Sequence, residues 1–141
     1  MATYRLIPPV KALWRDGYKI PVTSISTFVR HLAQPFGVNW APIPYSQITG
    51  DIGHPGIDIA LPVGQPIYAS TDGQITELDN SDDTDGLGLS IYDSSQHIIT
   101  MYWHNSFNNV PLNGLVTQGQ HIAISGGSGK SYGPHLHFAL Y

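Results

Sequence analysis

The segment His135-Leu136-His137, near the C-terminal end of the chain, contains the residue types best suited to chemistry. Two histidines separated by one residue point to the same face of a strand if the backbone is extended. Imidazole is a common ligand for divalent metals and a common general base near neutral pH. Taken alone, the pair is equally well explained as two hydrogen-bonded surface histidines, so its function depends on which other groups lie near it.

A second stretch offers another imidazole, His54, and a carboxylate four residues later, Asp58. The proline and glycine between them disfavour a helix, but a turn leading into a strand would let both side chains converge on one ion. Zinc takes four nitrogen, oxygen or sulfur donors, and a catalytic site leaves one position for water. His54, Asp58 and one of His135 or His137 would supply three protein ligands. The chain has no cysteine, so a thiolate site is excluded.

Composition limits the classes of protein to which the chain can belong. Its 141 residues correspond to one ordinary domain, and 41% of them are hydrophobic, which is enough for a core. Only 11% are charged, the formal net charge is -4, and the seven histidines outnumber the six lysines and arginines. No basic stripe points to nucleic acid, and no apolar run approaches the roughly 20 residues of a membrane span.

Short apolar runs separated by Gly, Pro, Asn and Asp predict an all-β domain with mostly antiparallel strands. The Asp16-Gly17 pair predicts a hairpin turn, and the spacing of apolar residues over 24–33 is compatible with one short helix. Residues 106–114 are expected to be loop. Strands are predicted over residues 11–14, 18–22, 57–60, 67–70, 73–78, 87–92, 96–104 and 119–125.

Two further segments contain residues typical of ligand sites but lack the rest of the motif. The acidic segment 79–86 lacks the glycine and the closing glutamate of an EF-hand loop, which favours a solvated loop. The glycine-rich segment 126–133 contains Gly-Lys-Ser, but its first glycine is too close and a strand is expected to follow, so it is not a phosphate-binding loop.

Several stretches, taken together and in order, resemble the lysostaphin-like (LytM-type) zinc endopeptidases, which cut peptide bonds in bacterial peptidoglycan. The resemblance covers residues 53 to 138. It lies in residues 53–60, in 64–69 with 72–73, in 102–104, in 119–123 and in 128–138.

The resemblance implies a compact antiparallel β-sheet or sandwich with the active site in a groove on the sheet. It implies one zinc ion per chain, held by His54, Asp58 and His137. His104 and His135 would be uncoordinated and would position and deprotonate the water. Tyr45, upstream of the first ligand, would donate to the oxyanion.

This sequence also departs from the family pattern. Trp103 stands before His104 where smaller residues are usual, and Asn105 follows where Leu is common. Residues 1–44 match no family motif. We therefore expect an N-terminal accessory segment over 1–44, able to dock to a larger assembly, and a metallopeptidase domain over 45–141.

The expected function is zinc-dependent hydrolysis of peptide bonds in peptidoglycan, in a cross-bridge or a stem peptide. A catalytically silent peptidoglycan-binding or structural module of the same fold is the alternative. Biotinyl- or lipoyl-type domains are disfavoured because no lysine lies in a matching hairpin tip. Zinc D-Ala-D-Ala peptidases are disfavoured because their first His and Asp are spaced more widely than His54 and Asp58.

The expected site of action follows from the same features. The prolines at positions 8 and 9 interrupt the first apolar run, so the start of the chain does not read as a signal peptide. Together with a cell-wall substrate, this favours a phage virion protein or a lysis protein (endolysin) released at the host cell wall. A bacterial extracellular or periplasmic protein lacking its leader is the alternative.

Overall fold

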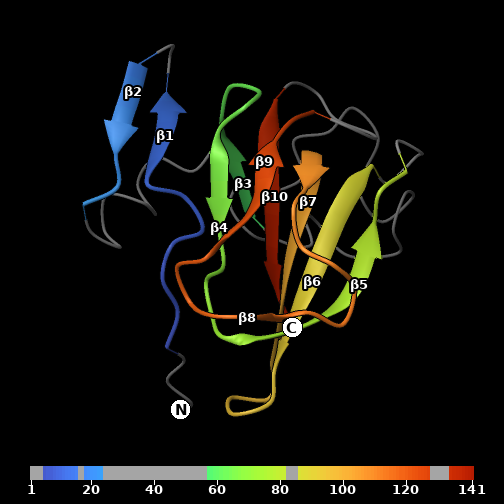
Figure 1. Ribbon diagram of the computed structural model, residues 1–141. Coiled ribbons are helices and arrows are strands. Elements are labelled where there is room, and N and C mark those ends of the chain that lie inside the picture. Colours follow the sequence, from blue (N-terminus) through green and yellow to red (C-terminus); the bar gives the residue numbers. More distant parts are fainter. Residues whose placement is uncertain (1–4, 16–17, 24–56, 82–85, 128–133) are drawn as a thin grey trace, which may run out of the picture.

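The computed structural model describes residues 5–15, 18–23, 57–81, 86–127 and 134–141. Within them the secondary structure consists of strands, as the sequence predicts (Figure 1). The strands are β1 (Ala12–Arg15), β2 (Tyr18–Pro21), β3 (Ile57–Ala60), β4 (Pro66–Tyr68), β5 (Gly73–Asp79), β6 (Leu87–Asp93), β7 (Ile98–Asn108), β8 (Leu115–Val116), β9 (His121–Ser125) and β10 (His135–Leu140).

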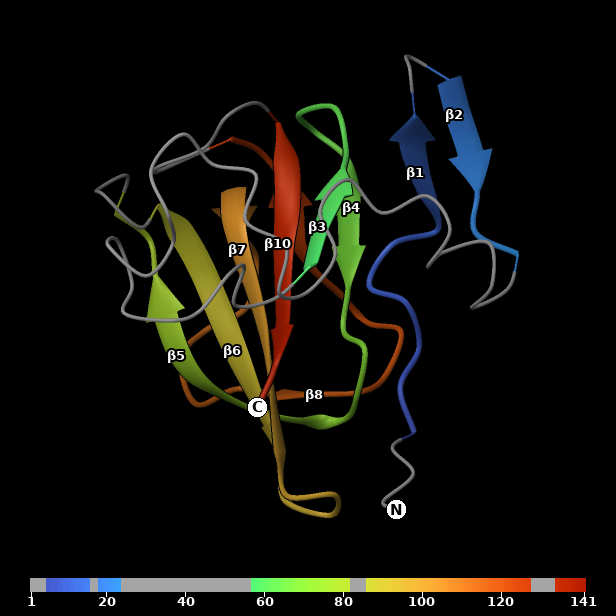
Figure 2. The same ribbon diagram turned by 180° about the vertical axis from the view of Figure 1, so that it is seen from behind.

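The larger sheet has eight strands, and all of its pairings are antiparallel. Its main path runs β3-β10-β7-β6-β5-β8, while β4 pairs with β9, and β9 pairs with the C-terminal half of β7. β7 therefore pairs with three strands, β10, β6 and β9, and the sheet branches there. Figures 1 and 2 show β4 on one side of β10 and β7, with β6 and β5 on the other.

The core lies between these parts of the sheet, because inward-facing residues of nearly every strand are apolar. Ile59, Ile67, Ile75, Leu89 and Leu136 are each fully buried. At roughly 25 cal/mol per Å² of apolar surface, such side chains supply the main stabilisation of the fold.

A buried tyrosine joins the two parts of the sheet. The backbone N–H of Ser70 donates to the Tyr102 hydroxyl at 2.8 Å, and that hydroxyl donates to Thr100 Oγ1 at 3.0 Å. Burial raises the pKa of Tyr102, so the hydroxyl stays protonated and keeps its donor role.

The β1–β2 hairpin forms a separate two-stranded sheet beside β4 and β3 (Figures 1 and 2). Val10 and Leu13 bury their side chains in the common core. The Tyr68 N–H donates to the Pro9 carbonyl at 2.7 Å, and the Ile7 N–H donates to the Ser70 carbonyl at 3.0 Å. The hairpin is thus fixed to the main body by both packing and backbone hydrogen bonds.

Most predicted strands are present with ends shifted by a few residues, but two predictions were wrong. β7 continues to Asn108 instead of ending at residue 104, because its last residues pair with β9. The expected loop 106–114 therefore begins within a strand. β8, which pairs with the start of β5, was not predicted because two residues carry no periodicity. The helix expected over 24–33 lies outside the described residues.

No helix in the described part of the chain has the length and apolarity needed to cross a membrane.

Candidate active site

Strand β10 places the His-x-His pair between β3 and β7 of the larger sheet. His137 lies opposite Asp58 of β3 on one side and opposite Trp103 of β7 on the other. Trp103 in turn lies opposite Gly88 of β6. Directly opposed residues of neighbouring strands share a face, so these four residues form a row across four strands.

Asp58 is the point on which the imidazoles of β10 converge. His137 Nδ1 lies 3.2 Å from Asp58 Oδ1, and His135 Nε2 lies 3.5 Å from the same oxygen. Both rings therefore reach one face, as expected for an extended strand. The Asp58 residue is only 7% exposed. A carboxylate at this depth requires charged or hydrogen-bonding partners, and the two imidazoles provide them.

His104 of β7 completes the cluster. Its ring centroid lies 4.8 Å from that of His135 and 6.1 Å from that of His137. In a regular strand His104 would point away from the face that holds Trp103. Here β7 has a bulge, since Trp103 pairs with Gly88 while Asn105 pairs with Leu87, which leaves His104 as the extra residue.

The backbone at His104 has the left-handed conformation that accompanies this bulge, with φ 67°. A β-bulge bends its strand and turns the side chain of the extra residue, a device found next to active sites. The bulge therefore directs the imidazole toward the two histidines of β10. The sequence predicted His104 at a strand end, whereas it lies inside the long strand β7.

Two buried amides hold the bulged part of β7. Asn105 Nδ2 donates to the Tyr102 carbonyl at 3.2 Å and to Asn108 Oδ1 at 2.8 Å. Asn108 Nδ2 donates in turn to the Gly88 carbonyl at 3.1 Å and to the Asp79 carbonyl at 2.9 Å. Sequence reasoning found Asn105 only as a departure from the family pattern and missed Asn108, although two buried asparagines three apart in a strand are an uncommon pattern.

Gly88 is a second residue whose role the sequence did not reveal. A methyl group at this position would overlap the indole ring of Trp103, so only glycine lets the ring lie against β6. Trp103 is 9% exposed, and it lies between the histidine row and β6. A glycine inside a strand often marks such a close approach, and this was the available signal.

The remaining two predicted site residues, His54 and Tyr45, lie outside the described residues. Among the residues that are described, no group of three or more His, Cys, Asp and Glu is arranged to hold a metal. Two donors of the predicted ligand set are nevertheless in place, since 3.2 Å separates His137 Nδ1 and Asp58 Oδ1. Two donors each 2.0–2.1 Å from a tetrahedral zinc lie about 3.3 Å apart, so this pair fits the ion.

Comparison with known proteins gives a consistent result. The profile of Peptidase family M23 matches residues 52–141. The peptidoglycan DD-endopeptidase ShyC of Vibrio cholerae is 38% identical over 101 residues, which are 71% of this chain and 23% of that protein. Lysostaphin of Staphylococcus staphylolyticus is 34% identical over 102 residues, which are 72% of this chain and 21% of that protein. The chain thus spans about a fifth to a quarter of the length of these relatives.

Solved structures agree with the sequence relatives. The catalytic domain of lysostaphin from Staphylococcus simulans superposes with a TM-score of 0.69 at 28% identity, covering 83% of this chain and 84% of that domain. A zinc-containing peptidase from Vibrio cholerae superposes with a TM-score of 0.66 at 28% identity, covering 96% of this chain and 37% of that protein. The antiparallel fold, the cluster on its central strands and the matched profile together show that the chain belongs to Peptidase family M23.

Proposed function

We propose that the chain is a zinc-dependent endopeptidase that hydrolyses peptide bonds in bacterial peptidoglycan. The observation that carries this proposal is the convergence of one carboxylate and three imidazoles, from β3, β7 and β10, on one face of the sheet. The names of the relatives support the substrate class, because they include peptidoglycan DD-endopeptidases and a glycyl-glycine endopeptidase.

The proposed zinc ligands are Asp58, His137 and His54. When bound, zinc would supply Lewis acidity toward the scissile carbonyl and lower the pKa of the attacking water toward neutrality. The Asp58 carboxylate has a second task, because Asp58 Oδ1 also lies 3.5 Å from His135 Nε2 and can orient this ring, which is not a proposed ligand.

His104 and His135 are the proposed proton carriers. Their rings lie in an edge-on arrangement with centroids 4.8 Å apart, on the face that presents Asp58 and His137. Imidazole near neutral pH can take a proton from the attacking water and return it to the leaving amine. Tyr45 is proposed as the donor to the oxyanion that develops on the carbonyl oxygen.

The peptide cut would lie in a cross-bridge or a stem peptide of the cell wall. We also propose that the protein acts from a phage virion or after release at the host cell wall, with residues 1–44 docking it to a larger assembly. These two proposals rest on the substrate class and on residues 1–44, which match no family motif.

Two alanine variants separate the proposed roles. We expect His135→Ala to keep zinc but to lose at least about 100-fold in activity, because it removes a proton carrier and no ligand. His54→Ala should lose both zinc and activity. Zinc content is measured by mass spectrometry of the purified protein. Activity is measured as new amino termini released from purified peptidoglycan, and their identity gives the bond that is cut.

His121→Ala is the matched control, because this exposed histidine of β9 bonds the Ala123 carbonyl outside the cluster. It should retain both zinc and activity. Hydrolysis by His135→Ala at the wild-type rate would contradict the role of His135. A wild-type protein that binds peptidoglycan but releases no amino terminus would instead identify a silent binding module.

A further inference from the structure

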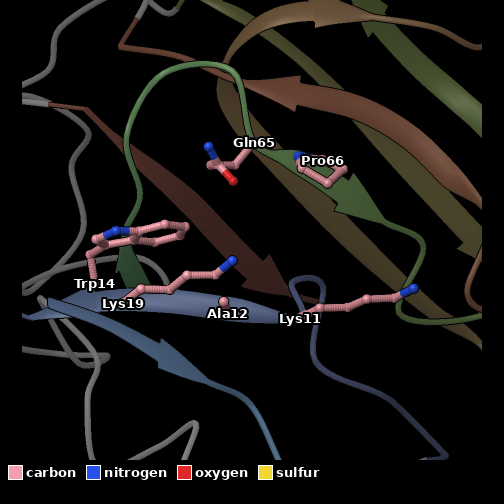
Figure 3. A pocket seen from close by; sticks show the side chains of 6 residues that line it. All are labelled: Lys11, Ala12, Trp14, Lys19, Gln65 and Pro66. Carbon is pink, nitrogen blue, oxygen red and sulfur yellow. The ribbon is translucent and has the colours of Figure 1, made fainter.

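A small cleft lies between the β1–β2 hairpin and the start of β4, apart from the histidine cluster. It has a volume of about 110 Å³, and six residues line it (Figure 3): Lys11, Ala12, Trp14, Lys19, Gln65 and Pro66. Figure 3 shows the Trp14 indole, the Lys19 ammonium and the Gln65 amide around the same space. A flat aromatic ring, an amide and a cation together suit a sugar ring that carries an anionic group.

The cations of this cleft are held over aromatic rings. Lys11 Nζ lies 4.5 Å from the centroid of the Tyr68 ring, and Lys19 Nζ lies 5.8 Å from that of Trp14. Within the described part of the chain, neither ammonium group is paired with a carboxylate. Their positive charge is therefore available to an anion from outside the protein.

Basic and acidic residues are unevenly distributed along the chain. Residues 5–19 hold four basic residues and one acidic residue, a net charge of +3. The rest of the chain holds two basic and nine acidic residues, a net charge of -7. Three of the six cations, Lys11, Arg15 and Lys19, lie on or next to the hairpin, so an acidic protein presents this hairpin to an anionic partner.

The cleft is preformed, because the hairpin is anchored beside it. Leu13 is fully buried in the core, and the Tyr68 N–H donates at 2.7 Å to the Pro9 carbonyl, just before the hairpin. A site built on fixed strands loses little entropy when it binds. Its volume is below the roughly 300–1,000 Å³ of sites that enclose a small molecule, so it suits one unit of a longer polymer.

We propose that this cleft binds an anionic glycan polymer of the bacterial cell wall, as a second contact beside the peptidase site. The choice of the cell wall rests on the proposed function, whereas the cleft and its charge do not. β1 packs against β3, the strand that carries Asp58, so one polymer could engage both sites. Two contacts with one polymer raise the effective concentration of the substrate at the catalytic histidines.

The test measures binding without cleavage, in full-length protein carrying His135→Ala. This protein is sedimented with purified insoluble cell walls that retain their phosphodiester polymers, at graded concentrations. We expect Trp14→Ala and Lys19→Gln each to weaken binding about fivefold or more, as for residues at the centre of a binding site. Trp14→Phe, which keeps an aromatic face, should retain most of the affinity, and a thermal melt of each variant verifies folding.

Matched controls come from the same region of the chain. Tyr18 is 76% exposed, adjoins Lys19 in β2 and does not line the cleft, so Tyr18→Ala removes an aromatic ring from the same hairpin. Arg5→Gln removes one positive charge outside the cleft. Both should bind as the parent does. Folded Trp14→Ala and Lys19→Gln variants that bind as tightly as the parent would overturn the proposal, as would equal losses in the two controls.

The source of the anion is distinguished with cell walls stripped of phosphodiester polymers by hydrofluoric acid. Binding that persists and still depends on Trp14 and Lys19 assigns the contact to carboxylates of peptidoglycan. If binding depends on Trp14 and Lys19 only with unstripped walls, the cleft contacts phosphodiesters. Cleavage of a short soluble peptide by the wild-type protein is followed separately. Its failure would count against the peptidase proposal and leave the result for the cleft unaffected.

Discussion

His104 shows how a single backbone conformation serves the site. A non-glycine residue at φ 67° carries a steric cost, which histidine tolerates better than most residues. At His104, this strained conformation belongs to the bulge that brings the imidazole to His135 and His137. His97 has a similar φ of 56° in the exposed turn before β7, without a place in the cluster. The two histidines can therefore be compared directly, because both have a positive φ and only His104 has a proposed catalytic role.

We expect His104→Gly to be more stable than His104→Ala by about 1 kcal/mol, because glycine adopts the left-handed region without a Cβ clash. Both variants should lose activity, since both lack the imidazole. The same pair at His97 should show the same difference in stability with activity intact. Urea denaturation gives the free energies of unfolding. Equal stability of the two His104 variants would show that the bulge does not hold this φ in solution.

Asp93, at the end of β6, is a buried carboxylate that does not belong to the histidine cluster. Burial raises its pKa, but hydrogen bonds from Ser95, Thr71 and Gln96 outweigh this effect and hold the pKa well below its usual value of 3.8. The Thr71 hydroxyl donates at 2.5 Å and Gln96 Nε2 at 2.8 Å, both to Asp93 Oδ2. The ionised carboxylate thus ties the β6–β7 turn to the segment that precedes β5.

This lowered pKa predicts a specific dependence of stability on pH. The ionised form stabilises the fold fully above the unfolded-state pKa, and this contribution is lost as pH falls below about 4 toward the folded-state pKa. Asp93→Asn should therefore be less stable than wild type at pH 7, and the difference should shrink below pH 4. Thermal melts from pH 7 to pH 3 measure it. Asp72→Asn, at an exposed position, controls for the loss of one charge, and a gap for Asp93→Asn that does not change with pH would contradict the prediction.

At the scale of elements, the site depends on four strands standing in one register. Asp58, His137, Trp103 and Gly88 are direct partners across β3, β10, β7 and β6. Since the side-chain period of a strand is two, a slip of one residue in any of these pairings would move a member to the other face. The indole of Trp103 against Gly88 sets how closely β7 can approach β6 beside the bulge.

Gly88→Ala should lower activity because its methyl group would force the Trp103 ring from its place beside His104 and His137. We expect a loss of stability of about 1–3 kcal/mol as well. The double variant Gly88→Ala, Trp103→Leu should recover part of both losses, since leucine leaves room for the methyl group. Activity and urea denaturation of the four proteins complete the cycle. Strict additivity of the two substitutions would show that the ring and the glycine do not interact.

At the scale of the whole molecule, chemistry and charge are separated. The histidine cluster lies on β3, β10 and β7 of the main sheet, while three of the six cations lie on or next to the N-terminal hairpin at its side (Figures 1 and 2). The hairpin shares the core through Val10 and Leu13, so the two regions keep a fixed relation. Under the two proposals above, the protein would hold an anionic polymer at the hairpin and present its histidines at the central cluster.

The sequence by itself determined the strand content, the placing of His135 and His137 on one face and the chemical types in the site. These follow from local rules: alternation along a strand, turn residues and the preferences of imidazole and carboxylate. Only the tertiary structure decided which residues meet. Asp58 and His137 are 79 residues apart in the sequence. The direction of the His104 side chain depends on a bulge in the pairing of β7 with β6. Register and bulges arise from contacts between distant segments, and a local pattern contains no information about its distant partner.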